Sequence, residues 1–520
     1  MNNLDGQLLS ALIAALLLAW IASWLAGKRY ASKMLSLMQL GTAPNNQQLS
    51  PATAINTATF APPSGTSSLN LLSQNQRART RLCLVMVLLS LVIASIISYV
   101  SQAAYVEEGF SWLRLGTLTI IFVWPVVPTI GLLERWSRSK ILVMATLYVL
   151  FSSSLVAVNS NEQQDMPAVI FWLFTQQLPL LLVIFFITGS KLRSTGPYLI
   201  LVFFILMLST LLGLAALEHN INKGLDSWIL ELSALTSVKT VFFLFSITPW
   251  LIAFFPARAL ARWLADAYQR KAFSEPLYLA AGLWSITLLF QAMILSHSLG
   301  GTAYALLLAI FLFPISMPII QRGLQPRHQP PNLLLLRVFR GDDSIEALFD
   351  QVIERWRYSG NTLLIAGKDL ALRNLEPDEL FNFLSGRLQT RFIDSQQHLQ
   401  NLLENLDFKA DPDGRFRVNE FFCFDSTWKM VLDGLVQRVD RVLMDLRGYT
   451  PDREGCSHEL RVLAVNTQLK KLVILFDKDT NKAAAEALLN GSSLKIHWVD
   501  SNNPAAPTAS EILRALLVDG

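Results

Sequence analysis

Charged residues are scarce in this sequence. Asp, Glu, Lys and Arg make up 16% of its 520 residues, whereas hydrophobic residues make up 52%. Soluble proteins carry roughly 25% charged residues, so this composition excludes a chain built only from soluble domains. The shortage is confined to one part, because residues 1–331 hold 31 charges and residues 332–520 hold 51. We therefore predict a membrane region over residues 1–320, a linker over 321–331 and a soluble domain over 332–520.

Other absences narrow the function. The cysteines Cys83, Cys423 and Cys456 are isolated, which excludes a disulfide framework, a paired zinc signature and an iron–sulfur run. The sequence has no Gly-rich GxxxxGK loop, so NTP hydrolysis lacks its phosphate cradle. Basic residues of the soluble part do not cluster with aromatic ones, so we expect no nucleic acid among the partners. We also predict no metal site and no bound cofactor.

Long apolar runs fill the first part of the chain. A helix needs about 20 apolar residues to cross the roughly 30 Å hydrocarbon core of a bilayer. Nine runs meet this length: 7–26, 82–104, 115–133, 141–158, 167–189, 197–217, 234–256, 277–297 and 303–320. Some are short or contain proline, so eight or ten crossings also fit. The prediction is an all-α bundle of about nine transmembrane helices, with the lipid bilayer as partner.

The segments between the runs differ in charge. With the N-terminus outside, 17 of the 20 basic residues in the membrane region fall on the inside; Arg114 and Lys223 fall outside, and Lys239 falls within a run. Because an excess of lysine and arginine marks cytoplasmic loops, we predict an external N-terminus and a cytoplasmic C-terminal domain. From the architecture we assign the protein to the inner membrane of a bacterial cell.

Two of the inside segments have distinctive compositions. Residues 34–76 contain no charge and are rich in Ser, Thr, Asn, Gln, Pro and Ala, which predicts a disordered cytosolic loop. In residues 257–275 a charged residue recurs every four positions, opposite an apolar stripe. This stripe predicts a helix that lies on the cytosolic membrane surface.

Polar side chains within the apolar runs could belong to a transport pathway. Lys239 is close enough to the outer end of its helix to reach water. Gln176, Gln177 and Gln291 lie mid-run, where amides commonly form hydrogen bonds between helices. No Asp or Glu lies mid-run. A transporter with a regulatory cytosolic domain is therefore a weaker alternative, which a water-accessible cavity lined by Gln176, Gln177 and Lys239 would favour.

The soluble part alternates short apolar runs with amphipathic helical patterns. The expected strands are 333–339, 362–366, 415–424, 441–446, 472–476 and 495–499, and the expected helices are 344–358, 376–386, 392–406, 426–439, 456–466, 482–489 and 509–517. This alternation predicts a doubly wound, flavodoxin-like α/β domain with a mostly parallel sheet covered on both faces. The alternating pattern at the start of 415–424 favours a strand on a sheet edge.

Ligands of such sheets bind beyond the carboxyl ends of the strands, so the polar residues there are the candidates. They are Arg340, Gly341, Asp342 and Asp343 after the first strand, Gly367, Lys368 and Asp369 after the second, Asp445, Arg447 and Gly448 before the helix that holds Glu459, and Asp477 and Asp479 after the next strand. Solvated loop acids are commoner than Mg²⁺ sites built from such aspartate pairs.

Two short motifs resemble those of TIR domains. Residues 338–343, Val-Phe-Arg-Gly-Asp-Asp, resemble the first-strand signature Phe-Arg-Gly-Glu-Asp, and residues 455–460, Gly-Cys-Ser-His-Glu-Leu, resemble Trp-Cys-x-x-Glu-Leu. Residues 471–479 have the place and character of the strand that follows. About 115 residues separate the two motifs, which is more than is usual in the family and implies an insertion around 376–424. Gly455 stands where the family has Trp.

The resemblance implies chemistry on NAD. In catalytic TIR domains the glutamate that matches Glu459 supports cleavage between nicotinamide and ribose, so the protein would be an NAD⁺ glycohydrolase with NAD as substrate. Arg340, Gly341, Asp342, Asp445 and Arg447 are then the candidates to bind it. A carboxylate beside the ribose can stabilise an oxocarbenium-like transition state. Alternatively, Glu459 only stabilises an early turn of its helix.

The sequence thus predicts a membrane-anchored signalling or defence effector whose cytosolic domains self-associate. A non-enzymatic scaffold is the main alternative, since many TIR-like domains only associate. The enzyme requires Glu459 in an open pocket near Arg340 and Asp342, whereas a filled crevice favours the scaffold. A Cys456–His458 nucleophile and base pair is disfavoured, because residues two apart on a helix point about 200° apart.

Overall fold

The computed structural model describes residues 3–39, 68–105, 109–134, 136–159, 165–188, 196–222, 224, 228–326, 329–337, 343–366, 383, 388–492, 494–501 and 509–518. The chain divides into two compact units. The first comprises Met1–Tyr30, Val85–Met317 and Arg373–Ser385, and the second comprises Ala31–Leu84, Pro318–Leu372 and Gly386–Gly520. We call them the bundle unit and the sheet unit.

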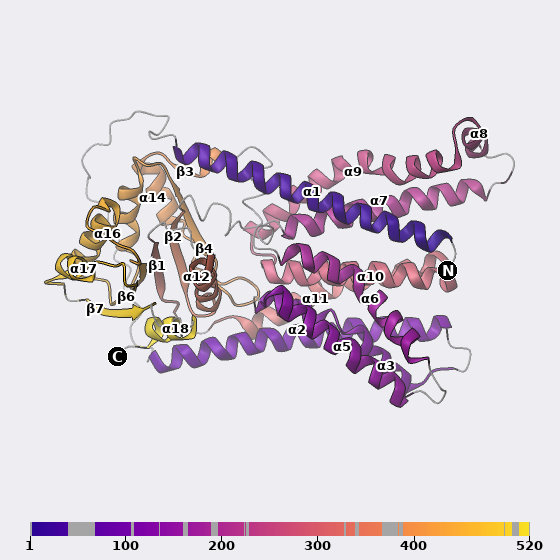
Figure 1. Ribbon diagram of the computed structural model, residues 1–520, viewed down its shortest axis with the longest axis horizontal. Helices are drawn as coiled ribbons and strands as arrows, with labels where there is room; N and C mark the ends of the chain where they lie inside the picture. The colour runs from indigo at the N-terminus through magenta and orange to yellow at the C-terminus, as the bar shows by residue number, and fades with distance from the viewer. Residues whose placement is uncertain are drawn as a thin grey trace. The chain divides into compact units, whose positions relative to one another are not determined.

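The described part of the bundle unit is helical (Figure 1). Its helices are α1 (Asn3–Gln39), α2 (Ser68–Tyr105), α3 (Trp112–Phe122), α4 (Val126–Leu133), α5 (Arg138–Asn159), α6 (Met166–Ile187), α7 (Gly196–Ile221), α8 (Trp228–Leu235), α9 (Val238–Gln269), α10 (Glu275–Leu299), the 3₁₀ helix η2 (Gly300–Phe311) and α11 (Leu312–Leu324). Three of them, α1, α2 and α11, extend into the sheet unit. Among the described residues, eight helical stretches are long and apolar enough to cross a membrane. The prediction of a membrane protein is supported to this extent.

The last of these stretches, Glu275–Leu324, contains two of the nine apolar runs. Gly300 ends α10 with a positive φ of 59°, a conformation that glycine adopts without strain. After Gly300, η2 packs back against α10. Leu307 of η2 contacts the apolar cluster to which Leu283 and Ile286 of α10 belong. The chain therefore reverses its direction at Gly300, inside the longest candidate stretch.

Two helical segments are longer than the sequence pattern indicates. The run 234–256 and the surface helix expected over 257–275 are not separate, because α9 is continuous from Val238 to Gln269. The uncharged loop expected over 34–76 is shorter, because α1 continues to Gln39 and α2 begins at Ser68. Residues 40–67 lie outside the described residues. Uncharged polar residues are compatible with helix when tertiary contacts stabilise it.

A parallel sheet forms the core of the sheet unit. Its strands are β1 (Asn332–Arg337), β2 (Asn361–Ala366), β3 (Phe392–Ile393), β4 (Val418–Cys423), β5 (Arg441–Asp445), β6 (Lys471–Phe476) and β7 (Lys495–Asp500). Their order is β3-β4-β2-β1-β5-β6-β7, and every neighbouring pair is parallel. The register pairs Leu334 of β1 with Leu363 of β2 and with Val442 of β5. The prediction of a parallel sheet is confirmed.

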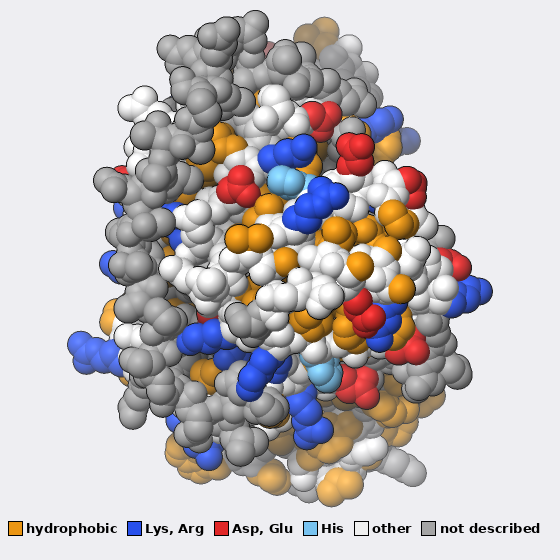
Figure 2. All heavy atoms as spheres, turned by 90° about the vertical axis from the view of Figure 1, so that its left-hand side faces the viewer, with side chains coloured by type: hydrophobic (Ala, Val, Ile, Leu, Met, Phe, Trp, Pro, Cys, Tyr) orange, Lys and Arg blue, Asp and Glu red, His pale blue; other side chains and the backbone are white. Residues whose placement is uncertain are grey.

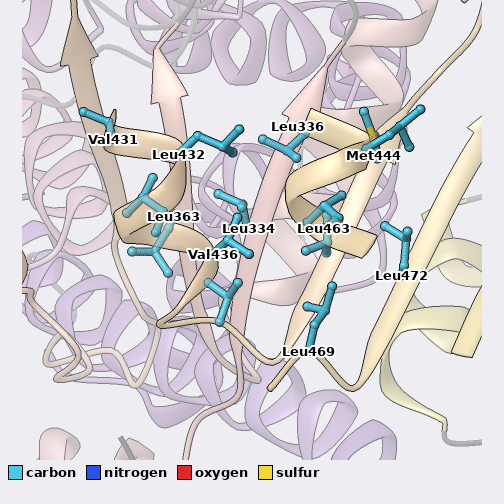
Figure 3. Packing of buried hydrophobic residues seen from close by; sticks show 14 of the residues in the cluster. Leu334, Leu336, Leu363, Val431, Leu432, Val436, Met444, Leu463, Leu469 and Leu472 are labelled. Atoms are coloured by element: carbon cyan, nitrogen blue, oxygen red, sulfur yellow. The ribbon is translucent and has the colours of Figure 1, made fainter. Parts of the chain in front are cut away.

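Helices pack in two groups around this sheet. The first group consists of α12 (Asp343–Trp356) and α18 (Ala509–Leu517), which pack on each other. The second is the row α14 (Gln396–Glu404), α15 (Trp428–Val436), α16 (Glu454–Val465) and α17 (Lys482–Leu489). Figure 3 shows side chains of α15 and α16, among them Leu432 and Leu463, packed with Leu334, Leu363 and Met444 of the strands. Because strands β1 and β5 are buried, they read as continuous apolar runs.

The segment between β2 and β5 differs from the prediction. β4 is not an edge strand, because it pairs with β2 on one side and with the two-residue strand β3 on the other. Residues 392–406 were expected to form one helix, but they begin with strand β3, and the helix α14 starts only after Ser395. The hydroxyl of Ser395 caps α14, since it accepts a hydrogen bond from His398 N at 3.2 Å. The helix expected over 376–386 lies outside the described residues except for Phe383.

Candidate functional site at the carboxyl edge of the sheet

The strand order fixes where the chain changes direction across the sheet. β1 lies between β2, the next strand in sequence, and β5, which follows about 100 residues later. The topological switch point is therefore the carboxyl edge between β1 and β5, where ligands of doubly wound sheets bind. Arg340, Gly341 and Asp342 follow β1 in the sequence and lie outside the described residues. Their proximity to Glu459 stays a prediction.

Asp445 and Arg447 stand at this edge and bind each other. Arg447 Nε lies 2.8 Å from Asp445 Oδ1, and Arg447 Nη2 lies 2.7 Å from Asp445 Oδ2. Both side chains are buried. Such a bidentate, charge-assisted pair is strong and holds both groups in one geometry. The two residues that the sequence proposes as contacts to NAD therefore neutralise each other, and their role toward a ligand stays a prediction.

The loop between β5 and α16 is fixed by the loop after β6. Asp477 Oδ1 accepts hydrogen bonds from Gly448 N at 2.8 Å and from Thr480 Oγ1 at 2.7 Å. Asn481 N donates to Tyr449 O at 2.8 Å, and the hydroxyl of buried Tyr449 lies 2.9 Å from Ser457 Oγ. Asp477 thus acts as a structural acceptor. These bonds hold the first turns of α16 at the carboxyl edge.

Glu459, in the second turn of α16, carries an unusual carboxyl group. Its Oε2 is buried and has no hydrogen-bond partner among the described residues. Burial raises the pKa of Glu459 to about 8, because removal from water penalises the charged form. At neutral pH the group is therefore mostly protonated. A helix-dipole role needs an ionised carboxylate in the first turn, so this geometry does not favour the purely structural interpretation.

Trp428 lies beside the segment that carries Glu459. Its Cη2 is 3.9 Å from the place where a Cβ of Gly455 would be, and its ring meets the ring of His458 edge-on at 5.6 Å. Gly455 precedes Glu459 by one helical turn, so the two lie on the same face of α16. The sequence pattern gave no indication of Trp428, since 27 residues separate it from Gly455 and only the packing of α15 on α16 brings them together.

The thiols of the sheet unit are not activated. Burial raises the pKa of Cys456 to about 12, and the nearby Glu459 acts in the same direction. Burial also raises the pKa of Cys423 to about 12. A nucleophilic cysteine needs the opposite shift. The ring of His458 faces Trp428, which agrees with the expectation that Cys456 and His458 do not form a catalytic pair.

Polar residues of the bundle unit are arranged as interhelical contacts. Gln291 Nε2 of α10 donates a hydrogen bond to Gln176 Oε1 of α6 at 2.8 Å, as the sequence suggests. Gln177 is buried, whereas Lys239 is exposed in the first turn of α9. Gln176 therefore forms a contact between helices. The described residues do not bring it together with Gln177 and Lys239 in a transport site.

The face of the sheet unit that carries α16 and α17 has charges of both signs. Figure 2 shows the face with α16 and α17, on which the described Lys, Arg, Asp and Glu side chains are interspersed among apolar ones. Among the described residues, no group of three or more His, Cys, Asp and Glu side chains could hold a metal ion. Neither the scan of protein-family models nor the searches of curated proteins and of solved structures gives a match to this chain.

Proposed function

We propose that the protein is a membrane-anchored signalling or defence effector whose TIR-like sheet unit cleaves NAD⁺. The observation that carries this proposal is Glu459 Oε2, which is buried without a hydrogen-bond partner among the described residues. Glu459 stands on the helix that follows the strand at the switch point. A polar group without a partner in a buried position costs free energy. Such a cost is typical of groups that serve a ligand.

The strand order supports the family assignment. The order β2-β1-β5-β6-β7 corresponds to the order 2-1-3-4-5 of flavodoxin-like sheets. The additional strands β3 and β4 lie beyond β2 and come from residues 392–423, within the segment where the motif spacing implies an insertion. Trp428 packs beside Gly455, so an aromatic ring is close to the position at which the family motif has its Trp.

The proposed reaction is hydrolysis of the bond between nicotinamide and ribose. The positively charged nicotinamide ring favours ionisation of a nearby carboxyl, so binding of NAD⁺ drives the proton from Glu459. The carboxylate then stabilises positive charge that develops on the ribose as nicotinamide departs with the bonding electron pair. Water adds to the ribose carbon, and its proton passes to Glu459. The products are nicotinamide and ADP-ribose.

We further propose nine crossings of a bacterial inner membrane, with the N-terminus outside and the sheet unit in the cytoplasm. The charge bias between segments supports this orientation. The reversal at Gly300 supports two crossings within Glu275–Leu324. Asn75 of α2 hydrogen-bonds residues of the sheet unit, which supports placing the start of α2 on the same side as that unit.

A scaffold without catalytic activity is the second candidate. It is favoured by the burial of Glu459 Oε2, since the enzyme requires an open pocket at Glu459. It is also favoured by the buried Asp445–Arg447 pair, which occupies two of the side chains proposed to contact NAD. In that case the carboxyl edge would serve only for association between copies of the sheet unit. The two functions differ in whether NAD is consumed.

The test is NAD⁺ consumption by the full chain in lipid nanodiscs, free in solution and crowded on beads. Wild type is compared with Glu459→Gln, with Glu454→Gln as the matched control, because Glu454 is exposed at the start of the same helix. We expect Glu459→Gln to lower the rate by about 10²-fold or more, whereas Glu454→Gln keeps it. A wild-type rate no higher than that of Glu459→Gln under both conditions removes the enzyme and leaves the scaffold.

A further inference from the structure

Helix α2 belongs to both compact units. It is 38 residues long, about 57 Å at roughly 1.5 Å per residue, whereas the hydrocarbon core is roughly 30 Å thick. Its first part, up to Leu84, belongs to the sheet unit, and from Val85 onward it belongs to the bundle unit. The same backbone hydrogen-bond ladder thus continues from the apolar span into the sheet unit.

Within the sheet unit, α2 contacts the C-terminal end of α12. The amide of Asn75, which is 4% exposed, donates to Arg355 O at 2.6 Å and to Ser359 Oγ at 2.7 Å. The last carbonyl groups of a helix have no partner within the helix and carry partial negative charge. Asn75 therefore caps α12 with a side chain from a different helix, and both donors of its amide are used.

The same end of α12 is also attached to the segment 411–417. Glu354 Oε2 lies 2.8 Å from Arg415 Nη1, and Arg357 exchanges two hydrogen bonds with the backbone of Phe416, at 2.7 and 2.8 Å. The segment in turn touches the end of α11. Gln325 Nε2 donates to Asp411 O at 2.9 Å, and a Cβ on Gly414 would lie only 2.2 Å from Leu324 O.

The opposite end of α12 follows the carboxyl end of β1 in the sequence. Asp343, its first residue, follows the connection from the carboxyl end of β1, which borders the switch point. The helix has 14 residues and is about 21 Å long. A short helix held by hydrogen bonds moves as a rigid rod, so a displacement at its C-terminal end also displaces its first turn.

We propose that α2, through Asn75 and α12, transmits movement of the membrane helices to the carboxyl edge of the sheet. The proposal rests on the function proposed above, because it names the regulation of that site. The coupling itself does not depend on NAD chemistry, because what α2 transmits is a displacement of α12. The end of α11 contacts residues 411–417, which in turn contact the same end of α12.

The experiment is hydrogen exchange of the full chain in lipid nanodiscs, with no NAD present. Asn75→Leu removes both donors and keeps the same number and branching of side-chain heavy atoms, and Gln76→Leu, at the exposed next position of α2, is the matched control. Ser359→Ala removes only one acceptor and provides a milder variant if Asn75→Leu is poorly folded. We expect Asn75→Leu to speed exchange about fivefold in both ends of α12 and in residues 446–453. Gln76→Leu is expected to leave exchange unchanged.

Faster exchange that is confined to the last turn of α12 in both Asn75→Leu and Ser359→Ala overturns the proposal, because Asn75 is then only a local cap. Equal acceleration in β7 and α17 also overturns it, since that result reports general destabilisation. The exchange pattern does not depend on catalysis. A chain that shows the expected pattern and consumes no NAD⁺ retains the transmission and loses only the enzyme.

Discussion

At the scale of single residues, Glu459 and Asp445 show how two carboxyl groups of one sheet edge differ. Asp445 is buried beside Arg447 and is bound by two of its nitrogens. Glu459 carries a buried oxygen, Oε2, that has no hydrogen-bond partner among the described residues. Asp445 is held in place by Arg447, whereas burial raises the pKa of Glu459. Glu459 is therefore expected to change its charge near neutral pH.

This difference predicts a pH dependence of stability. The pKa of Glu459 rises from its ordinary value of 4.5 to about 8 in the folded protein. Its contribution to stability is thus complete below pH 4.5 and is lost as the pH rises to 8. With about 1.4 kcal/mol for each pKa unit, the loss is on the order of a few kcal/mol. Glu459→Gln is expected to remove this dependence, measured as the melting temperature of the full chain between pH 5 and pH 8.5.

Glu454→Gln is the control, because Glu454 lies exposed at the start of α16. It is expected to keep the wild-type decline. If Glu459→Gln declines as steeply as wild type, Glu459 is ionised throughout this range, and the interpretation of its burial is wrong.

At the scale of elements, the contact between α6 and α10 shows how polar residues stabilise the bundle. Gln176 and Gln291 form a direct amide hydrogen bond in an apolar setting. The sequence was sufficient to predict that these amides bind between helices, because an unpaired amide is costly within a bilayer. It could not pair Gln176 with Gln291, since the partner depends on which helices are neighbours.

A double-mutant cycle tests this contact. Gln176→Leu and Gln291→Leu each leave one amide without its partner, so each is expected to destabilise the bundle by about 0.6–2 kcal/mol. The double variant loses both polar groups together, and its cost is expected to be smaller than the sum of the two. The measurement is reversible unfolding in mixed micelles. Strictly additive costs would show that the two amides do not interact in the membrane.

The elements that the sequence misplaced share a physical cause. The strand at 418–423 was expected at an edge because its first residues alternate, yet it pairs on both sides. The alternation reflects half-buried positions at the start of β4 and full burial at its end. Similarly, α9 is continuous through a change from apolar to amphipathic composition. Composition reports which solvent surrounds a segment, and it does not report where a helix or a sheet ends.

At the scale of the whole molecule, the number of membrane crossings decides on which side each part lies. An odd number of crossings separates the two ends of the chain, whereas an even number leaves them on the same side. The reversal at Gly300 is the point on which the count depends. If Glu275–Leu324 crosses once, Gly301 lies near the middle of the membrane. If it crosses twice, Gly301 lies at the outer surface.

A cysteine at position 301 distinguishes the two counts. A Cβ at Gly301 meets no atom within 4 Å, so Gly301→Cys fits the fold. We expect a membrane-impermeant maleimide to label Gly301→Cys in intact cells. Gly323→Cys, near the end of α11 and equally open, is expected to be labelled only after permeabilisation. The wild-type chain reports any labelling of its native cysteines. An unlabelled Gly301→Cys in permeabilised and intact cells alike would contradict nine crossings.

The division of the chain into a membrane part and a sheet was predictable from composition. Apolar runs and the later alternation of strand and helix patterns each have a clear solvent-driven cause. The helical ends of α1 and α2 that flank residues 40–67 were not predictable, because residues 34–76 are uncharged and rich in polar side chains. The start of α2 is held by Asn75, which hydrogen-bonds Arg355 and Ser359, about 280 positions later. The sequence was enough to predict that the candidate site lies at the carboxyl edge of the sheet. The Asp445–Arg447 pair and the position of Trp428 beside Gly455 could be found only from the structure.

The central pairing of β1 with β5 has a consequence during synthesis. Leu333 of β1 pairs with Arg441 of β5, so a ribosome must add about 100 residues before this pairing can form. At roughly 5–20 residues per second, the interval is on the order of 5–20 s. During this interval β1 lacks strand β5, which later pairs with one of its edges. The nascent chain thus exposes four consecutive leucines, Leu333–Leu336, and a chaperone that binds short leucine-rich segments would find its substrate there.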